Sequence, residues 1–405
     1  MAEKSILIFG AGKIGRSFIG QLFGKAGYKL IFVDMDHSLV QELNKRNSYP
    51  VVIKGPDHEE ILQIEKVSAI HASDEPRIIH AIGTTDLAAI SVGKNGIPAL
   101  TEVVAKGLLE RERIFPGQVL DVILAENMRS AGNYIYERLR EVLPASYPLD
   151  LRVGLVETSI GKMVPLMTAS DLKDDSLQVF AEPYNTLILD RLGFKGEIPT
   201  IEELSLKDNI KAWVDRKAFI HNLGHASAAY CGHLKHPNAT FMYEVLADPT
   251  VLGFTKKVML ESAQILRKVY PSEFPGESLS EHIHDLLNRF QNRNLGDTVY
   301  RVGCDLHRKL GPLDRFMGVV RVARETNQSC GTILEAMAMG FLFQARDEMG
   351  VMLTGDIEFH TLFNKNPDQT FKHVCGLNKD EEADAAITEQ LEQHINRLRS
   401  RHLTT

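Results

Sequence analysis

Three polar residues of types that serve alcohol oxidation recur at helical spacing in the middle of the chain. They are Lys217, Asn222 and His225, with His221 in the same segment. In an α-helix five residues turn through about 500° and eight through about 800°, so the three share a broad face. An amine can take a proton, an amide can donate hydrogen bonds to a forming oxyanion, and an imidazole can orient a hydroxyl. The spacing predicts a proton-transfer site, whereas His221 is equally well explained as a packed helix residue.

A glycine-rich turn near the N-terminus predicts that a dinucleotide binds there. The apolar run 4–9 leads into the turn, and an amphipathic segment follows it. In this strand–turn–helix context the first glycine permits a tight turn, the second lets the backbone approach a pyrophosphate, and the third allows close packing of helix on strand. The helix N-terminus adds N–H donors for the phosphates. We therefore expect the whole turn to contact the cofactor: Gly10, Ala11, Gly12, Lys13, Ile14 and Gly15.

An acid ends the next predicted strand, at the place where the ribose of a dinucleotide would lie. The strand covers 29–33, and Asp34 follows it, about 20 residues after the glycines. A carboxylate at this place binds the ribose hydroxyls and repels a 2′-phosphate. The cofactor predicted by the sequence is therefore NAD in preference to NADP.

Apolar strands alternate with helical segments through the first half of the chain, which is typical of a doubly wound parallel sheet. Ligands of such sheets bind beyond the carboxyl ends of the strands, where Gly93 and Asn127 fall. Further strands are expected at 86–92, 119–124 and 152–156, a helix at 37–46, and two inserted short strands at 51–54 and 61–68.

From about residue 198 the 3.6-residue apolar period of helices takes over. The expected helices are 206–232, 250–270, 278–289, 313–324 and 332–349, and the charged stretch 379–401 is expected to be a solvated helix face. The fold class is therefore α/β, with an N-terminal doubly wound Rossmann-type domain over 1–197 and a mostly α-helical C-terminal domain over 198–405.

Composition narrows the class of protein further. The chain has 405 residues, 44% of them hydrophobic and 24% charged, with a formal net charge of −7. This suits two soluble domains and disfavours general nucleic-acid binding. No run approaches the ~20 apolar residues of a membrane span and the polar start does not resemble a signal peptide, so we expect a cytoplasmic protein, monomeric or homodimeric. The four separated cysteines predict free thiols and no metal site: Cys231, Cys304, Cys330 and Cys375.

Oxidation of an alcohol by NAD needs a base, a group that stabilises the developing oxyanion, and a carbinol carbon held against the nicotinamide. A zinc site would want clustered Cys and His, which the sequence lacks, and none of the ten tyrosines has the Lys four positions on that short-chain enzymes use. Lys217 remains as the candidate base. Its ordinary pKa, near 10.4, would have to be lowered by burial or by nearby positive charge.

The pattern Lys217-x4-Asn222-x2-His225 resembles the signature of the polyol-specific long-chain dehydrogenases/reductases, and its surroundings resemble the branch that acts on mannitol 1-phosphate. Other patches agree as far as residue 315: the turn 10–20 with Arg16, Glu126-Asn127-Met128, Arg289-Phe290-x-Asn292, Asp297, Arg301-Val302-Gly303, and Arg308-Lys309-Leu310-x3-Asp314-Arg315.

The resemblance implies NAD-dependent interconversion of mannitol 1-phosphate and fructose 6-phosphate. It implies that Lys217 is the general acid/base, that Asn127 and Asn222 form the oxyanion hole, and that His225 orients the substrate oxygen. Basic residues downstream are our candidates for the sugar phosphate, because arginine makes bidentate phosphate contacts: Arg308, Lys309, Arg315 and Arg301. Ion pairs with Asp297, Asp305 and Asp314 would account for these basic residues equally well.

One departure from the family pattern leaves the substrate open. The family reads Val-Asp-Arg where this chain has Ile160-Gly161-Lys162, so an acceptor for substrate hydroxyls is missing. Another polyol or an aldonate, such as mannitol/fructose or altronate/tagaturonate, is therefore an alternative. A glycerol-3-phosphate or 3-hydroxyacid dehydrogenase is a more distant one. An alternative from a different class of function is a non-catalytic NAD(H) sensor.

Overall fold

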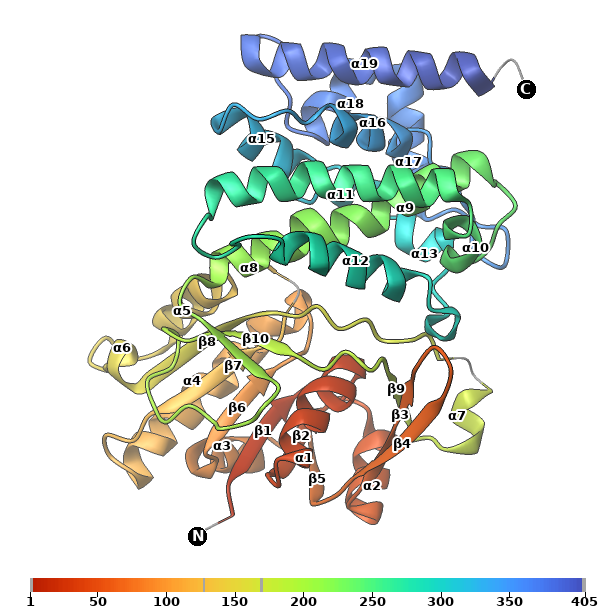
Figure 1. Cartoon of the computed structure of the whole chain (residues 1–405). Coiled ribbons are helices and arrows are strands. Elements are labelled where there is room, and N and C mark those ends of the chain that lie inside the picture. Colours follow the sequence, from red (N-terminus) through yellow and green to blue (C-terminus); the bar gives the residue numbers. More distant parts are fainter. Residues whose placement is uncertain (1–2, 127, 168–169, 403–405) are drawn as a thin grey trace. The chain divides into compact units, whose positions relative to one another are not determined.

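The structure, a computed structural model, describes residues 3–126, 128–167 and 170–402. The chain divides into two units, Met1–Val214 and Asp215–Thr405, which Figure 1 colours from red to yellow-green and from green to blue. The limit at 197/198 expected from the sequence lies before this division, because strand β11 (Leu204–Lys207) still pairs with β10 (Leu187–Asp190) in the first unit.

The first unit is built on a large sheet with the strand order β11-β10-β8-β7-β6-β1-β2-β5 in the described part of the chain. Its parallel strands are β1 (Ser5–Phe9), β2 (Lys29–Asp34), β5 (Val67–His71), β6 (Leu87–Ile90), β7 (Leu120–Leu124) and β8 (Val153–Ser159). The order β5-β2-β1-β6-β7-β8 is that of the dinucleotide-binding fold, which confirms the predicted doubly wound sheet. The direction in which successive strands are added reverses between β1 and β6. Ligands of such sheets bind beside this switch point.

Alternate residues of β1 enter two separate cores, as the two-residue period of a strand dictates. Ile6 and Ile8 lie in one core, with side chains of α1 (Gln21–Lys25) and α2 (His37–Arg46). Leu7 and Phe9 lie in the other, which the helices of the opposite face cover. Those helices are α3 (Glu75–Thr84), α4 (Ile97–Ile114) and α5 (Ala131–Val142), and two short helices, α6 (Leu149–Arg152) and α7 (Asp171–Asp174), complete the unit.

The predicted inserted strands are confirmed only in part. β3 (Tyr49–Lys54) and β4 (Glu59–Ile64) form a small antiparallel pair, to which β9 (Val179–Ala181) adds a parallel strand. The prediction that 61–68 is one strand was wrong. Lys66 has a φ of +59°, and this left-handed turn ends β4 and lets β5 pair with β2 in the large sheet.

The second unit is helical, with α9 (Leu223–Lys235) at its centre (Figure 1). This helix packs against α10 (Met242–Leu246), α11 (Pro249–Val269), α13 (Val299–Gly303) and α16 (Gly331–Gly340). Close approach to α11 requires a glycine, because a Cβ on Gly224 would lie 2.5 Å from Sδ of Met259. The remaining helices are α12 (Ser278–Phe290), α14 (Leu306–Lys309), α15 (Met317–Glu325), α17 (Thr354–Lys365), α18 (Pro367–His373) and α19 (Glu382–His402).

Several helix limits differ from those expected. The helix predicted at 206–232 begins with α8 (Ile210–Arg216), because Leu206 and Lys207 belong to β11. The helices predicted at 313–324 and 332–349 begin at Met317 and end at Gly340, respectively. The C-terminal helix is amphipathic, since a stripe of its side chains is buried: Ile387, Leu391, Ile395 and Leu398.

Candidate functional site

The glycine-rich turn leaves room for a ligand where the pyrophosphate was expected. Gly10 has a φ of +94°, and a Cβ there would lie 2.5 Å from the carbonyl oxygen of Ser91. A Cβ on Gly15 would lie 1.9 Å from the carbonyl oxygen of Gly10, so this turn requires both glycines. Gly12 and Gly93, in contrast, have open space where a Cβ would stand. Ala11 is buried, Ile14 half-buried and Lys13 exposed, so the turn fits a dinucleotide.

Asp34 is fixed beside this turn at the end of β2. Its Oδ2 accepts a hydrogen bond from the N–H of Ala11 (2.7 Å) and its Oδ1 accepts one from the N–H of Asp36 (2.9 Å). The residue is half-buried, so its carboxylate stays accessible while its orientation is set by backbone donors. This geometry suits the predicted contact with ribose hydroxyls, which stays a prediction.

A π-turn, η1 (Gly15–Gly20), follows the glycines. The N–H of Gln21 donates to the carbonyl oxygen of Arg16, five residues back, and the hydroxyl of Tyr49 donates to the same oxygen (2.8 Å). The guanidinium of Arg16 is buried and donates to the carbonyl oxygens of Ala11 (2.6 Å) and Leu177 (2.5 Å). Arg16 therefore holds the turn in place.

Glu126 anchors the second loop of the predicted cofactor site. Its Oε1 accepts a hydrogen bond from the N–H of Gly93 (2.9 Å), and burial raises the pKa of its carboxyl group. Gly93 has a φ of +78°, so this loop too depends on a glycine. The predicted oxyanion-hole residue Asn127 comes next in the chain and lies outside the described residues.

In the second unit the predicted catalytic segment also contains a π-turn, η3 (Lys217–Asn222), in place of the regular α-helix expected there. The N–H of Leu223 donates to the carbonyl oxygen of Ala218, five residues back. Within residues 219–232, all of which the structure describes, only Asn222 and His225 are not buried. Lys217, just before them, is also partly exposed. The three predicted residues are therefore the polar residues of 217–232 that are not fully buried.

His225 is held by an aromatic ring and lies near a carboxylate. Its ring stacks on Phe290, with the centroids 4.4 Å apart and the planes 8° from parallel, and its Nε2 lies 3.4 Å from Oδ2 of Asp297. Asp297 also forms an ion pair with Arg301. His221 is buried and packs near Phe290, with 5.5 Å between centroids. Burial is the main cause that lowers the pKa of both imidazoles, so both are neutral at physiological pH.

The four basic residues predicted to bind phosphate all have partners within the second unit. Arg301 pairs with Asp297, and Arg308 pairs with Asp305 and with Asp314 (3.5 Å). Nζ of Lys309 donates to the carbonyl oxygens of Val302 (2.7 Å) and Cys304. Arg315 donates from Nε to Asp314 (2.8 Å) and from Nη1 to the carbonyl oxygen of Asn222 (3.2 Å). The ion pairs considered as the alternative explanation are thus present, and the phosphate role stays a prediction.

Exposure divides these four side chains into two pairs. The side chains of Arg301 and Arg308 are 45% and 49% exposed, while Lys309 and Arg315 are buried. Helix α14, which carries Arg308 and Lys309, is fixed by Asp356 of α17. The carboxylate of Asp356 accepts hydrogen bonds from the N–H groups of Asp305 (3.0 Å) and Leu306 (2.7 Å).

Burial of the amine and nearby positive charge lower the pKa of two lysines. Burial, aided by the nearby charge of Arg315, lowers the pKa of Lys217 to about 8. The same two causes lower the pKa of Lys309 to about 7. Lys217 therefore has the acidity that the sequence required of a base working near neutral pH.

Gly161, which stands where the family pattern has Asp, leaves space beside the backbone because it has no side chain. A Cβ on Gly161 would meet the ring of Tyr184 at 3.6 Å, an ordinary contact, so the backbone does not exclude a larger residue. The neighbouring Lys162 is buried, and its Nζ donates to the side-chain oxygens of Gln21 (2.8 Å) and Asn185 (2.6 Å).

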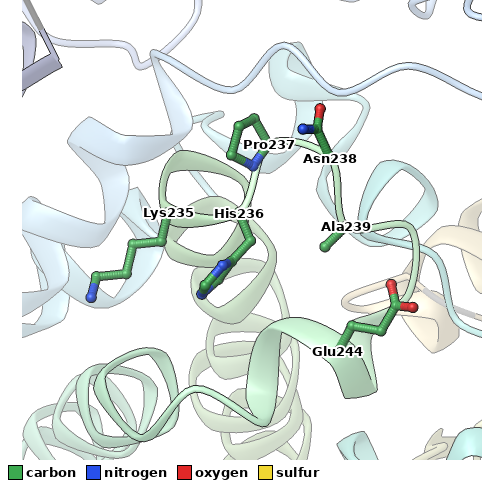
Figure 2. Close-up of a pocket in the computed structure, with 6 residues that line it drawn as sticks. All are labelled: Lys235, His236, Pro237, Asn238, Ala239 and Glu244. Carbon is green, nitrogen blue, oxygen red and sulfur yellow. The ribbon is translucent and has the colours of Figure 1, made fainter. Parts of the chain in front are cut away.

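A hollow at the other end of α9 is not a second candidate. Figure 2 shows its lining residues, Lys235, His236, Pro237, Asn238, Ala239 and Glu244. Three of its four polar side chains already have partners: His236 and Lys235 contact Asp248 at 2.9 and 3.7 Å, and Glu244 accepts two backbone N–H groups.

Among the residues that the structure describes, no three His, Cys, Asp or Glu side chains gather as metal ligands. In the same residues no helix is both long enough and apolar enough to cross a membrane.

Sequence reasoning gave no role in these sites to three contributors. Glu126 and Asp297 were noted only as parts of a resemblance or as ion-pair partners, and Ser262, whose hydroxyl donates to the carbonyl oxygen of Phe219 (2.6 Å), was not noted at all. The spacing of Asp297 and Arg301, one helical turn apart, was the available signal for that pair. Ser262 gave no signal in the sequence.

The sheet order and the glycine turn are those of a dinucleotide-binding domain. Comparison with known families makes this specific. Residues 4–203 match the model of the mannitol dehydrogenase Rossmann domain, and residues 209–396 match that of the mannitol dehydrogenase C-terminal domain. The chain belongs to the mannitol dehydrogenase family, as the resemblance indicated, and is an NAD-dependent oxidoreductase of the polyol type.

Solved structures that are similar to this chain match it at low identity. Yersinopine dehydrogenase in its apo form is 13% identical, with 98% of this chain and 99% of that chain covered and a TM-score of 0.46. Octopine dehydrogenase with NADH and pyruvate is 10% identical (84% and 88% covered, TM-score 0.47). Ketopantoate reductase from Staphylococcus aureus is 14% identical (83% and 97% covered, TM-score 0.42). These likenesses add no argument on the substrate.

Proposed function

We propose that the protein interconverts mannitol 1-phosphate and fructose 6-phosphate with NAD(H), without a metal, and that Lys217 is the general acid/base. The observation that carries this proposal is the pattern of exposure around η3. Within residues 217–232 the polar side chains that are not fully buried are those of Lys217, Asn222 and His225, that is, an amine, an amide and an imidazole. These are the groups that proton transfer, oxyanion stabilisation and substrate orientation need.

The acidity of Lys217 suits both directions of the reaction. With a pKa of about 8, roughly a quarter of the amine is neutral at pH 7.5, against about 0.1% for an ordinary lysine. In oxidation the neutral amine takes the proton of the substrate hydroxyl while the carbinol hydride leaves for the cofactor. In reduction the ammonium returns that proton to the carbonyl oxygen.

Two further residues would act on the same oxygen. The carboxamide of Asn222 donates to the oxygen as negative charge develops on it, with Asn127 as the second amide of the proposed oxyanion hole. The neutral imidazole of His225, fixed by its stack on Phe290, orients the substrate hydroxyl. Neutrality matters, because an imidazole can accept a hydrogen bond only without its second proton.

NAD supplies the hydride acceptor when it is bound. In our proposal the turn Gly10–Gly15 would hold its pyrophosphate, Asp34 its ribose hydroxyls, and Gly93 would border the same site. The open space at Gly12 and Gly93 supports this assignment, because ligand atoms can approach the backbone there. The two carboxylate oxygens of Asp34, already oriented by backbone donors, would repel the 2′-phosphate of NADP.

For the sugar phosphate we propose Arg301 and Arg308 as direct ligands, since solvent reaches these two side chains. The buried Lys309 and Arg315 would add positive charge to the surroundings. A phosphate would then share Arg301 with Asp297, and Arg308 with Asp305 and Asp314.

A second candidate is the same chemistry on a free polyol or an aldonate, such as altronate/tagaturonate. The observation in its favour is Gly161, which provides no acceptor for substrate hydroxyls and leaves space beside Tyr184.

A substrate panel tests these proposals. Oxidation of NADH would be followed with fructose 6-phosphate, fructose and tagaturonate, and we expect the highest kcat/KM with the first. Preference for tagaturonate or fructose would favour the second candidate, and tight NADH binding without turnover of any ketose would favour a sensor. Lys217→Ala should lower kcat by at least ~10²-fold and leave the Kd of NADH nearly unchanged. Turnover like that of the wild type would remove the assigned base.

A further inference from the structure

We propose that Ser262 and Arg315 are positioning residues, which hold the π-turn η3 and thereby align Lys217 with Asn222 and His225. This inference rests on the proposed function, since the alignment matters only if these three residues act on one substrate. It goes beyond that function because Ser262, on α11, belongs to no motif of the sequence, and because Arg315 takes a role other than phosphate binding.

The π-turn changes which side chains share a face. In a regular α-helix Lys217 and Asn222 would point about 140° apart, and Lys217 and His225 about 80° apart. A π-turn takes in about one extra residue, which removes about 100° from each separation. The angles then become about 40° and about 20°. The three groups thus lie on one narrow face because of the π-turn.

Two side chains from other segments of the second unit bind the carbonyl groups of this turn. The hydroxyl of Ser262, fully buried on α11, donates to the carbonyl oxygen of Phe219 at 2.6 Å. Nη1 of Arg315, which precedes α15, donates to the carbonyl oxygen of Asn222 at 3.2 Å. A π-turn disturbs the regular hydrogen bonds of a helix, and a buried carbonyl without a partner is costly. The two donors therefore favour the π-turn over the regular helix.

Arg315 is itself fixed, so its bond to the turn is not that of a mobile surface side chain. Its Nε donates to Oδ1 of Asp314 (2.8 Å), and its own N–H donates to the same oxygen (2.7 Å). Close packing adds to the constraint, since a Cβ on Gly318 would lie 2.7 Å from the ring of Phe219. The turn is thus held by a hydroxyl, a guanidinium and a tightly packed ring.

The first unit repeats this arrangement independently. In η1 the carbonyl oxygen of Arg16 accepts both the i→i−5 bond from Gln21 and a hydrogen bond from the buried hydroxyl of Tyr49 (2.8 Å). Tyr49 comes from β3, as Ser262 comes from α11. A hydroxyl from a neighbouring element therefore accompanies each of these two π-turns, which supports a stabilising role for such donors.

Arg315 has an electrostatic effect as well. Its charge, after burial, is the cause that keeps the pKa of Lys217 low. His221 and His225 face the same region, but both are neutral near pH 8, because their pKa values lie well below 6.5. A change at Arg315 should therefore move both the position and the acidity of the amine, whereas a change at Ser262 should chiefly move its position.

The test compares Ser262→Ala with Ser227→Ala. Ser227 is an equally buried serine whose hydroxyl donates to a carbonyl of its own helix, that of Leu223 (2.8 Å), outside the π-turn. We expect Ser262→Ala to lower kcat at least ~10-fold with the Kd of NADH within ~2-fold, and Ser227→Ala to stay within ~2-fold of wild type in both. If Ser262→Ala does not fold, Ser262→Cys, of similar size and with a weaker donor, takes its place. Unchanged kcat in the folded variant, or equal losses in the Ser227 control, would overturn the proposal.

A measurement that needs no turnover separates this inference from the proposed function. The rate at which acetic anhydride labels Lys217, followed by peptide mass spectrometry from pH 6 to 11, reports the pKa of the amine even if no ketose is reduced. Arg315→Gln should raise that pKa from about 8 toward the ordinary 10.5, and Arg315→Lys should keep it near 8. The same pKa in Arg315→Gln as in wild type would refute the role of Arg315, whatever the substrate panel shows.

Discussion

The pH dependence of turnover tests the role of Lys217 most directly. Burial and Arg315 lower the pKa of Lys217 to about 8. Oxidation needs the neutral amine, so kcat/KM for the polyol should rise as the pH increases through about 8. Reduction needs the ammonium, so kcat/KM for the ketose should fall over the same range. Between pH 6 and pH 8 the neutral fraction grows from about 1% to about 50%, which predicts a gain of about 50-fold in the oxidation.

The assay is the initial rate of NADH formation at saturating NAD and low polyol, from pH 5.5 to pH 10.5. Two other groups titrate in this range and need controls. Lys309, with a pKa of about 7, is removed in Lys309→Met, which should leave the midpoint near 8 in place. The phosphate of the proposed substrate titrates at pH ~6, so its ionisation must be divided out. A rate that continues to rise until pH 10 would refute the reasoning, because it would assign the base an ordinary lysine pKa.

Four further predictions concern single residues. Asp34→Ser should raise kcat/KM with NADP relative to NAD by at least ~10-fold, and a wild-type enzyme that already prefers NADP would contradict the role of Asp34. Gly10→Ala should destabilise the fold by about 2 kcal/mol or more, seen as a lower Tm, because of the φ of +94° and the contact with Ser91. Gly12→Ala, where a Cβ has open space, should keep its Tm but weaken NADH binding; equal Tm losses would argue against this. Asp297→Asn removes the charge between His225 and Arg301, so kcat should fall ~10-fold with the Kd of NADH unchanged, and full activity would exclude that role.

The features that the sequence predicted well are those with local causes. The requirement for glycine at 10 and 15 follows from a turn of a few residues, and Asp34 follows directly from the strand before it. The helix at 37–46 was found with its observed limits, since Asp36 caps its start and Asn47, with a φ of +52°, follows its last residue. The local sequence determines such turns, strand ends and helix limits regardless of the rest of the fold.

The features that it missed depend on distant partners. The donor that supports η3 at Phe219 lies 43 residues away, and the one at Asn222 lies 93 residues away. An amphipathic pattern cannot distinguish a π-turn from an α-turn without them. Strands of three or four residues, β9 and β10, are too short for their own period to show. The basic residues were found by type, but their pairing with Asp297, Asp305 and Asp314 became definite only in the folded structure.

The cap that Asp356 places on α14 links distant parts of the second unit. A helix of four residues has little stability of its own, so the orientation of Arg308 and Lys309 depends on a carboxylate about fifty positions downstream. If Arg308 binds the sugar phosphate as we propose, substrate preference can therefore be altered from α17 without any change in Arg308 itself. Random mutagenesis that selects for a new sugar should recover changes at Asp356 and its neighbours alongside those in the basic residues themselves.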